Sequence, residues 1–341
     1  MKAVVMHDVN NMVFEDMPTP SPGSGEMLLR VRATRVCGTD VGMYQGKHQG
    51  AFLPRVLGHE CAGEVVKVGD GVSGYKPGDR VIIDPLLYCG KCYYCRMGKN
   101  NLCENGGLMG REVNGSFAEY TIVTPERAVK MPDSMSFDVA SFVEVAGSVS
   151  HSHCMTQLLR PGNSVVVFGL GSMGMLHIQF AKLAGATPVI GVSRSQWKLD
   201  LARELGADVV INSKDEDPVA AINKLTPHGG ADVVIETAGV PATIRQSYDL
   251  VRPAGEILQY GIGPTSVDNI NSYLMYYKEI TIYGVRAFTF NDFSPAIKVI
   301  DSGAIQVEPL ITHRLPLEKT LEGFELSEKP SGKVLGIVIN S

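Results

Sequence analysis

A glycine-rich segment between a predicted strand and a predicted helix constrains the fold of this chain more than any other feature. The strand covers residues 164–168, an apolar run typical of a strand buried on both faces of a sheet. The helix covers residues 175–184. The glycines between them permit a tight turn and let backbone N–H groups approach a pyrophosphate at the helix N-terminus. The segment predicts a dinucleotide-binding fold with four residues at the cofactor: Gly169, Gly171, Met173 and Gly174.

The chain beyond this turn alternates predicted strands and helices. The helices cover residues 195–205, 217–226 and 241–251, and the further strands cover residues 187–192, 208–211, 232–236, 255–260 and 279–285. With the first strand, this order predicts a doubly wound, parallel sheet of six strands in an α/β fold. The loop after the fifth strand is expected to face the cofactor through Tyr260, Gly261 and Ile262.

The end of the second predicted strand bears on the choice of nucleotide. Dinucleotide folds usually have an Asp or Glu there, about 20 residues beyond the glycines, to bind the ribose hydroxyls. This chain has Ser193 and Arg194 instead, with Lys198 close behind. No carboxylate repels a 2′-phosphate, and a hydroxyl and a guanidinium are present to bind one. NADP(H) is therefore the preferred cofactor; the alternative is NAD(H), with Arg194 stacking on adenine or facing water.

The first part of the chain is predicted to be rich in β-strands. Residues 1–36 contain short alternating runs separated by turn signals at 18–23. Residues 58–69 and 80–83 are expected to be two strands joined by a Pro-Gly turn, and residues 115–131 two more. The apolar run at the end of the chain is expected to rejoin this domain.

Four cysteines follow the spacing C-x2-C-x2-C-x7-C, at Cys89, Cys92, Cys95 and Cys103. This spacing predicts a closed tetrahedral zinc site that folds a lobe without a core of its own. The alternatives are an iron–sulfur cluster or a redox pair. A nucleic-acid-binding zinc ribbon is disfavoured, because the chain is acidic and no basic stripe flanks the cysteines.

A second set of potential metal ligands is spread over more than a hundred residues: Cys37, His59, Glu60 and Glu144. One thiolate, one imidazole and two carboxylates suit zinc, and such a mixed set can keep a position open for catalysis. Taken singly, each residue has an ordinary structural interpretation. Thr39 would orient or accept the substrate proton, unless it is only a helix N-cap. Cys61 is predicted to be a core thiol, and His151 and His153 ordinary helix residues.

Composition excludes several classes of function. The chain has 341 residues, enough for two domains, with 44% hydrophobic residues, a net charge of −5 and a pI near 5.9. Nothing favours a nucleic-acid or anionic membrane surface, and no apolar run approaches the roughly 18 residues that span a bilayer. The N-terminal apolar run is too short for a signal peptide, so we expect a cytoplasmic protein whose cysteines are thiols or metal ligands.

Taken together, these motifs resemble the zinc-containing medium-chain alcohol dehydrogenase family over essentially the whole chain. The zinc signature G-H-E-x2-G-x5-G-x2-V is present from Gly58 to Val72, and segments 76–81 and 115–120 fit as well. The sequence Cys-Gly-Thr-Asp at 37–40 and the glutamate at position 144 look most like the polyol (sorbitol) and threonine dehydrogenase branch.

This resemblance implies a GroES-like, β-rich catalytic domain at 1–146 and 287–341, with a structural zinc lobe at 86–105. The dinucleotide-binding Rossmann domain would cover 147–286. A catalytic zinc would be held by Cys37, His59 and Glu144, with Glu60 as an alternating or water-bridged ligand, and a structural zinc by the four clustered cysteines. Val285 and Arg286, at the end of the last Rossmann strand, would lie near the cofactor. Homotetramers or dimers are common in this branch.

Three departures from the family pattern lie in residues that bear on the substrate and its proton. Gly42 stands where a relay histidine is usual, so proton release would use water, the cofactor ribose or another side chain such as His48. Met43 replaces an aromatic residue of polyol dehydrogenases. Residues 145–146 are Val-Ala where the family has Pro-Leu.

The sequence thus predicts a zinc-dependent oxidoreductase that transfers a hydride between NADP(H) and a secondary alcohol or polyol, or the corresponding ketone. The first alternative is an NAD-dependent enzyme of the threonine or sorbitol type. A non-catalytic nucleotide-binding sensor would be expected to lose catalytic ligands, and all of them are present here. A zinc-dependent nucleic-acid binder has only the four-cysteine lobe in its favour.

Overall fold

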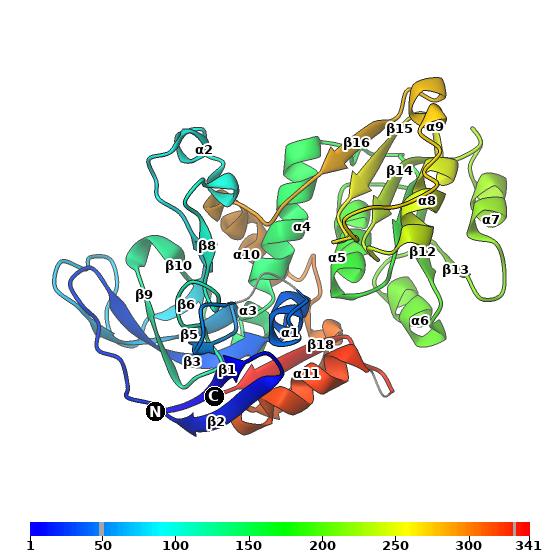
Figure 1. Ribbon diagram of the computed structural model, residues 1–341. Coiled ribbons are helices and arrows are strands. Elements are labelled where there is room, and N and C mark those ends of the chain that lie inside the picture. Colours follow the sequence, from blue (N-terminus) through cyan, green and yellow to red (C-terminus); the bar gives the residue numbers. More distant parts are fainter. Residues whose placement is uncertain (48–50, 330–331) are drawn as a thin grey trace. The chain divides into compact units, whose positions relative to one another are not determined.

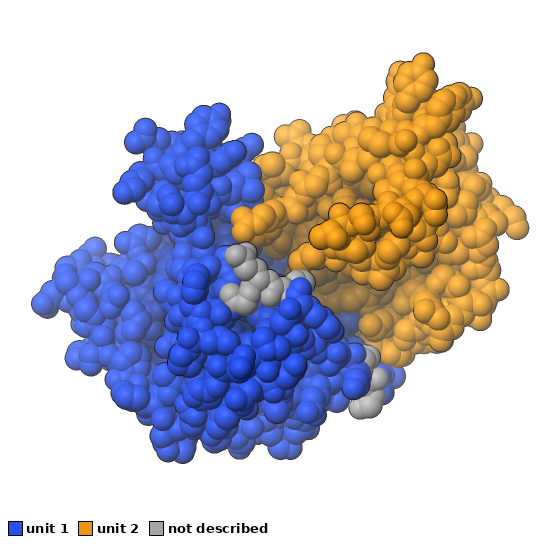
Figure 2. All heavy atoms as spheres, in the orientation of Figure 1, with its two compact units in different colours: residues 1–147, 288–303, 307–341 blue, residues 148–287, 304–306 orange. Residues whose placement is uncertain are grey.

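The computed structural model describes residues 1–47, 51–329 and 332–341, which form two compact units (Figure 2). The first unit contains Met1–Gly147, Phe288–Gly303 and Val307–Ser341, and the second contains Ser148–Ala287 and Ala304–Gln306. The assignment of residues 1–146 and 287–341 to catalysis, and of 147–286 to nucleotide binding, stays a proposal.

The first unit is built on β-sheets (Figure 1). The larger sheet has the order β10-β6-β5-β3-β18-β17, with β9 also pairing with β3, and β18 brings the end of the chain back beside β3 as expected. A second sheet has the order β2-β1-β4, and β7 pairs with β8. The strands are β1 (Lys2–Asp8), β2 (Asn11–Asp16), β3 (Met27–Arg35), β4 (Arg55–Val56), β5 (Glu60–Val68), β6 (Arg80–Ile83), β7 (Leu86–Leu87), β8 (Gly107–Leu108), β9 (Tyr120–Val123), β10 (Ala128–Lys130), β17 (Ile311–Pro316) and β18 (Gly336–Asn340).

Apolar side chains from the strands, from the loops and from α11 form the core of the first unit. Met6, Leu57, Phe117 and Phe324 are fully buried in one cluster. Cys61 is buried in a neighbouring cluster, which confirms its prediction as a core thiol. The helices that contribute to this unit are α1 (Gly38–Tyr44), α2 (Tyr93–Arg96), α3 (Phe137–Ala140), α10 (Phe293–Asp301), α11 (Thr320–Glu328) and the start of α4 (Val143–Thr156).

The second unit contains a six-stranded, all-parallel sheet in the order β13-β12-β11-β14-β15-β16. The strand order reverses between β11 and β14, so the predicted doubly wound sheet is confirmed. The strands are β11 (Val165–Phe168), β12 (Val189–Ser193), β13 (Val209–Asn212), β14 (Ala231–Glu236), β15 (Val251–Gln259) and β16 (Thr281–Gly284), and the helices are α5 (Ser172–Leu183), α6 (Gln196–Glu204), α7 (Pro218–Leu225), α8 (Pro241–Leu250) and α9 (Tyr273–Tyr277).

Local sequence explains why these elements form. All four residues of β11 are buried, and three are valines, whose β-branched side chains favour strands. Helix α7 begins with Pro218 at its first position, where a missing N–H costs nothing, and the Asp217 carboxylate caps it by accepting from the Val219 N–H at 3.2 Å.

Candidate functional site

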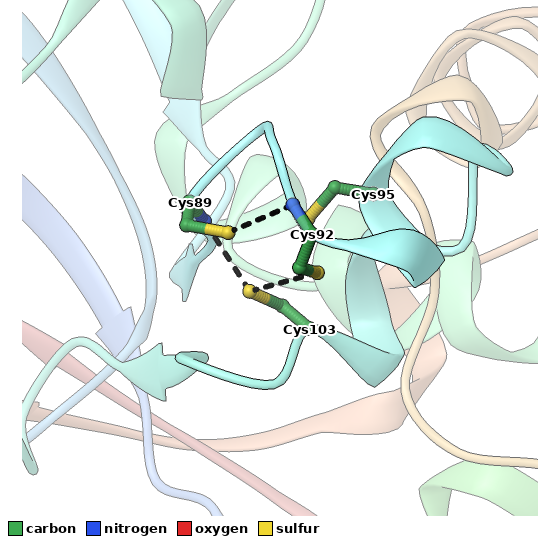
Figure 3. A group of neighbouring side chains, drawn as sticks. All are labelled: Cys89, Cys92, Cys95 and Cys103. Atoms are coloured by element: carbon green, nitrogen blue, oxygen red, sulfur yellow. Dashed lines mark hydrogen bonds between the residues drawn. The ribbon is translucent and has the colours of Figure 1, made fainter.

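The four clustered cysteines converge in the lobe between β7 and β8 (Figure 3). Their sulfur atoms all lie within 4.8 Å of one another. Cys89 accepts a hydrogen bond from the Cys92 N–H at 3.4 Å, and Cys103 accepts one from the Cys89 N–H at 3.3 Å. Backbone N–H groups of Lys91 and Cys92 lower the pKa of the Cys89 thiol to about 6, which favours the thiolate that a metal requires.

This lobe has little apolar packing of its own. Helix α2 buries none of its residues, Tyr93 is 67% exposed and Met97 is 59% exposed. All seven cysteines of the chain are free thiols, so no disulfide ties the lobe together. Four thiolates at these separations fit a closed tetrahedral zinc site, which would supply the missing cross-link.

A second group of metal-ligand atoms lies in the sheet of the first unit. Cys37, at the N-terminus of α1, and His59 and Glu60, at the start of β5, place one ligand atom each within 4.8 Å of one another. Residues far apart in the sequence meet because β3 and β5 are paired in register, with Arg35 opposite Glu60. A thiolate, an imidazole and a carboxylate fit zinc, and three protein ligands leave a fourth position open.

Two buried side chains hold these ligand residues. The Asp40 carboxylate is fully buried, lies 3.1 Å from His59 Nδ1 and accepts the Gly58 N–H at 3.1 Å, which leaves His59 Nε2 available to a metal. The Arg35 guanidinium, also buried, donates to Glu60 at 2.5 Å and lies 4.8 Å from the centroid of the Phe142 ring.

The pKa shifts of His59 and Glu144 indicate that a positive charge is favoured beside these ligands. Burial would lower the pKa of His59, yet Asp40 and Cys37 raise it well above its ordinary value. Burial, and then the charge of Glu60, raise the pKa of Glu144 to about 8. Several acidic groups thus share one buried region, and a bound cation would relieve their repulsion.

The remaining residues predicted at this site have mixed positions. Glu144, in the first turn of α4, is not among the three that converge in the described part of the chain. Thr39 lies in the first turn of α1; the N-cap position belongs to Cys37, so the alternative of Thr39 as the cap is wrong. Their catalytic roles stay predictions, and His48 lies outside the described residues.

A pocket of about 540 Å³ opens beyond the carboxyl ends of β11, β12 and β13 in the second unit. It includes the glycine-rich turn through Gly169 and Gly171, and the predicted phosphate ligands Ser193, Arg194 and Lys198. Ser195, Ser213 and Lys214 complete its polar side. The lining described contains three cationic side chains and no carboxylate, so the pocket suits an anionic ligand.

The glycine-rich turn is packed too closely for side chains. A Cβ on Gly174 would lie 1.9 Å from the Gly169 carbonyl oxygen. Gly169 itself has φ near +84°, a conformation that L side chains rarely adopt. The turn therefore leads directly into the N-terminus of α5, where backbone N–H groups point outward and favour a pyrophosphate.

Other residues predicted at the cofactor lie outside this pocket in the described chain. They are Met173, Gly174, Tyr260, Gly261, Ile262, Val285 and Arg286. The Tyr260 hydroxyl donates to Ser148 at 2.7 Å and approaches the Met173 sulfur at 3.6 Å. Ile262 is 80% exposed. Their roles at the cofactor stay predictions.

Sequence reasoning did not single out several residues of these sites. Ser213 and Lys214 follow β13, and the rule that adjacent parallel strands end at one edge would have indicated them. The sequence around Arg35 did not indicate its role, because nothing near it predicts an ion pair with Glu60, 25 residues away.

Comparisons with known proteins agree with these features. A family model described as an alcohol dehydrogenase GroES-like domain matches residues 23–133, and one described as a zinc-binding dehydrogenase matches residues 172–302. An L-threonine 3-dehydrogenase of Pyrococcus abyssi is 36% identical over 328 residues, which cover 94% of this chain and 93% of that relative. A sorbitol dehydrogenase of Bacillus subtilis is 31% identical over 343 residues, with coverages of 99% and 97%. The structure of a zinc-binding dehydrogenase of Sinorhizobium meliloti 1021 bound to NADP is 32% identical, with a TM-score of 0.94 and coverages of 100% and 99%.

The two-unit fold, the two groups of metal-ligand residues and these matches together define a zinc-dependent dehydrogenase. The chain belongs to the zinc-containing medium-chain alcohol dehydrogenase family, which confirms the resemblance and the GroES-like plus Rossmann fold. It is an oxidoreductase that acts on CH–OH groups with zinc and a nicotinamide cofactor. In the described part of the chain, no helix is both long and apolar enough to cross a membrane.

Proposed function

We propose that this enzyme oxidises a secondary alcohol or polyol, or reduces the corresponding ketone, with a preference for NADP(H) over NAD(H). The observation that carries the nucleotide preference is the cationic pocket beside β12 and β13. It presents Arg194, Lys198 and Lys214 together with serine hydroxyls, where an NAD-specific site would place a carboxylate.

Lys198 supports this proposal most directly. Its side chain is half-buried, and burial lowers its pKa. No carboxylate lies within ion-pair distance of it among residues 1–47, 51–329 and 332–341. A partly desolvated ammonium without an acidic partner is costly unless a ligand supplies the negative charge, and a 2′-phosphate does so. A relative of known structure is bound to NADP.

The metal ligands would divide between two zinc ions. We assign Cys89, Cys92, Cys95 and Cys103 to a structural zinc, and Cys37, His59 and either Glu60 or Glu144 to a catalytic zinc. When bound at the latter site, zinc acts as a Lewis acid that lowers the pKa of a coordinated alcohol. Asp40 fixes the ring of His59, and Arg35 fixes the carboxylate of Glu60.

The chain's own residues must then handle the substrate proton. Thr39 lies two residues after Cys37, and its half-buried hydroxyl is the group that we assign to orient or accept this proton. Gly42 offers no side chain at the position where a relay histidine is usual. The onward path would therefore use water or the ribose hydroxyls of the nucleotide.

A second candidate is an NAD-dependent enzyme of the threonine type, and the identity with an L-threonine 3-dehydrogenase favours it. Initial rates with NADP+ and NAD+ over polyols, secondary alcohols and threonine separate the two. The variant Ser193→Asp should shift the preference toward NAD+, because its carboxylate would repel a 2′-phosphate and bind a ribose hydroxyl. Strong preference of the wild type for NAD+ would refute the proposed cofactor specificity.

The role of the metal site has its own test. Replacing Cys37 or His59 with Ala should abolish turnover while the nucleotide still binds. Cys154→Ser, which changes an exposed cysteine of the second unit, is the matched control and should keep full activity. Retained turnover in Cys37→Ala would contradict the proposed site.

Two further proposals concern the setting of the enzyme. We propose a cytoplasmic location, which seven free cysteines support because thiols persist in a reducing compartment. We also propose a homodimer or homotetramer. Three tyrosines on α9 support it, since Tyr273, Tyr276 and Tyr277 are 60%, 80% and 68% exposed, and exposed aromatic patches often mark interfaces.

A further inference from the structure

A fully buried carboxylate ends the fourth strand of the parallel sheet. Glu236 is the last residue of β14, and its side chain has no exposed surface. The strand order reverses between β11 and β14, and ligands of doubly wound sheets bind at the carboxyl ends of strands at such a point. Glu236 thus lies where a dinucleotide is expected, yet it is absent from the lining of the pocket described above.

The Glu236 carboxylate receives five hydrogen bonds. Its Oε1 accepts from the backbone N–H groups of Ala238 and Gly239, both at 3.0 Å, and from the Thr243 hydroxyl at 2.7 Å. Its Oε2 accepts from Gly239 N–H at 3.1 Å and from Gln259 Nε2 at 2.8 Å. The donors belong to the loop after β14, to α8 and to the end of β15, so one side chain ties three elements together.

Backbone contacts extend this arrangement to the glycine-rich turn. A Cβ on Gly261 would lie 2.5 Å from the Gly239 nitrogen, and a Cβ on Gly169 would lie 2.9 Å from the Ala238 nitrogen. The loop held by Glu236 is therefore in direct contact with the glycine-rich turn on one side and with the loop after β15 on the other. Ala238, Val240 and Thr243 from the same loop and helix also line the nucleotide pocket.

We propose that Glu236 is a positioning residue for the dinucleotide: its carboxylate holds residues 237–240 and 260–262 in the arrangement that binds the cofactor. N–H and O–H donors face both of its oxygens, so it forms a polar network that joins the loop after β14 to α8 and to the end of β15. It does not touch a phosphate and so acts equally on NADP+ and NAD+. This inference rests on the proposed dehydrogenase function but not on the proposed preference for NADP(H).

The variant Glu236→Gln tests this role, because it keeps the shape and replaces one acceptor oxygen by a donor. At the Oε1 position the new NH2 group would face two backbone N–H donors, and at the Oε2 position it would face Gly239 N–H and Gln259. We expect the Kd of both NADP+ and NAD+, measured by calorimetric titration, to rise about tenfold, with unchanged zinc content. The KM for the alcohol should stay near the wild-type value while the KM for either nucleotide rises.

Two further variants separate positioning from general stability. Ile222→Val removes one methyl group from the core of the second unit without touching a hydrogen bond to Glu236, and should lower Tm without changing either Kd. Gln259→Met removes the bond from β15 to Glu236, together with the 3.3 Å bond from the same amide to the Gly261 carbonyl oxygen, and should raise both Kd values about three- to fivefold. It also serves if Glu236→Gln does not fold.

The outcomes are decisive in both directions. Equal weakening of both nucleotides in each of Glu236→Gln and Gln259→Met that folds, beside an unchanged Kd in Ile222→Val, supports the positioning role. Wild-type Kd values in either folded loop variant overturn it, whatever happens to Tm. A wild-type enzyme that prefers NAD+ would refute the proposed cofactor preference and leave this result intact.

Discussion

Removing the ammonium of Lys198 should weaken NADP+ binding and leave NAD+ binding unchanged. Hydrogen bonds to charged groups contribute about 1.5–3 kcal/mol, which corresponds to roughly 10- to 150-fold in Kd. Lys198 is half-buried, so solvent screens part of its charge, and we expect the lower part of that range for Lys198→Met: about 10- to 30-fold. Arg194 is exposed, and Arg194→Ala should therefore cost less.

The assay is calorimetric titration of each nucleotide at about 0.15 M salt, where the Debye length of about 8 Å suppresses long-range charge effects. Lys224→Met, which removes an exposed positive charge from α7 in the same unit, should leave both Kd values unchanged. The reasoning is refuted if Lys198→Met binds NADP+ as tightly as the wild type. It is also refuted if the variant weakens NAD+ by the same factor, because NAD+ carries no 2′-phosphate.

Three other predictions follow from the packing described above. Cys103→Ser should release one zinc per chain and expose residues 86–105 to protease, as metal analysis and limited proteolysis would show; retention of two zincs would contradict the closed site. Gly174→Ala should abolish nucleotide binding, since its Cβ would meet the Gly169 carbonyl oxygen at 1.9 Å, and unchanged affinity in a titration would contradict this. His177 is buried and His153 is half-buried, with His177 Nδ1 3.0 Å from His153 Nε2. Loss of solvation lowers the pKa of His153 to about 3 and that of His177 well below its ordinary value. Below about pH 6.5 these histidines bind protons in the unfolded chain but stay neutral in the folded one. The free energy of unfolding should therefore fall as pH drops from 6.5 toward 4, by up to about 1.4 kcal/mol per pH unit for each ring. Urea unfolding at several pH values should show a shallower loss for His177→Phe, and an identical slope would be evidence against the pair as its source.

The parts of the fold that the sequence revealed are those governed by local rules. Strands buried on both faces must be continuously apolar, so β11 and its neighbours could be recognised individually, and the glycine-rich turn indicated a doubly wound sheet. The four-cysteine lobe was visible because its ligands lie within fifteen residues of sequence. Strand β15 was expected to begin at residue 255, but it begins at Val251. Pro253 and Gly255 are turn signals, and here they lie in an irregular stretch of the β14–β15 pairing instead.

The supporting partners of the metal ligands could not be predicted in the same way. Arg35 and Asp40 act through residues that only strand pairing and chain reversal bring near, and a buried charge gives no periodic signal of its own. The same holds for Glu236, which completes an ordinary-looking strand. Such residues become recognisable only when the donors around a carboxylate are known.

Asp40 has a consequence for how the enzyme acquires and exchanges its metal. Its carboxylate accepts the Gly58 N–H and lies beside the His59 ring, and it also lies 3.4 Å from the Cys37 nitrogen. The two segments that deliver the thiolate and the imidazole are therefore fastened by the protein itself, before any ion arrives. The entropy of closing that loop is lost during folding, and an incoming ion need not compensate for it. We expect this centre to tolerate depletion and refilling with cobalt at native temperature. The cysteine lobe is held by hydrogen bonds to its own sulfur atoms and by little apolar packing, so its ion should enter as the lobe folds and leave only when the lobe opens. Two zinc sites in one chain would then differ in exchange rate by orders of magnitude, and isotopic zinc would label one long before the other.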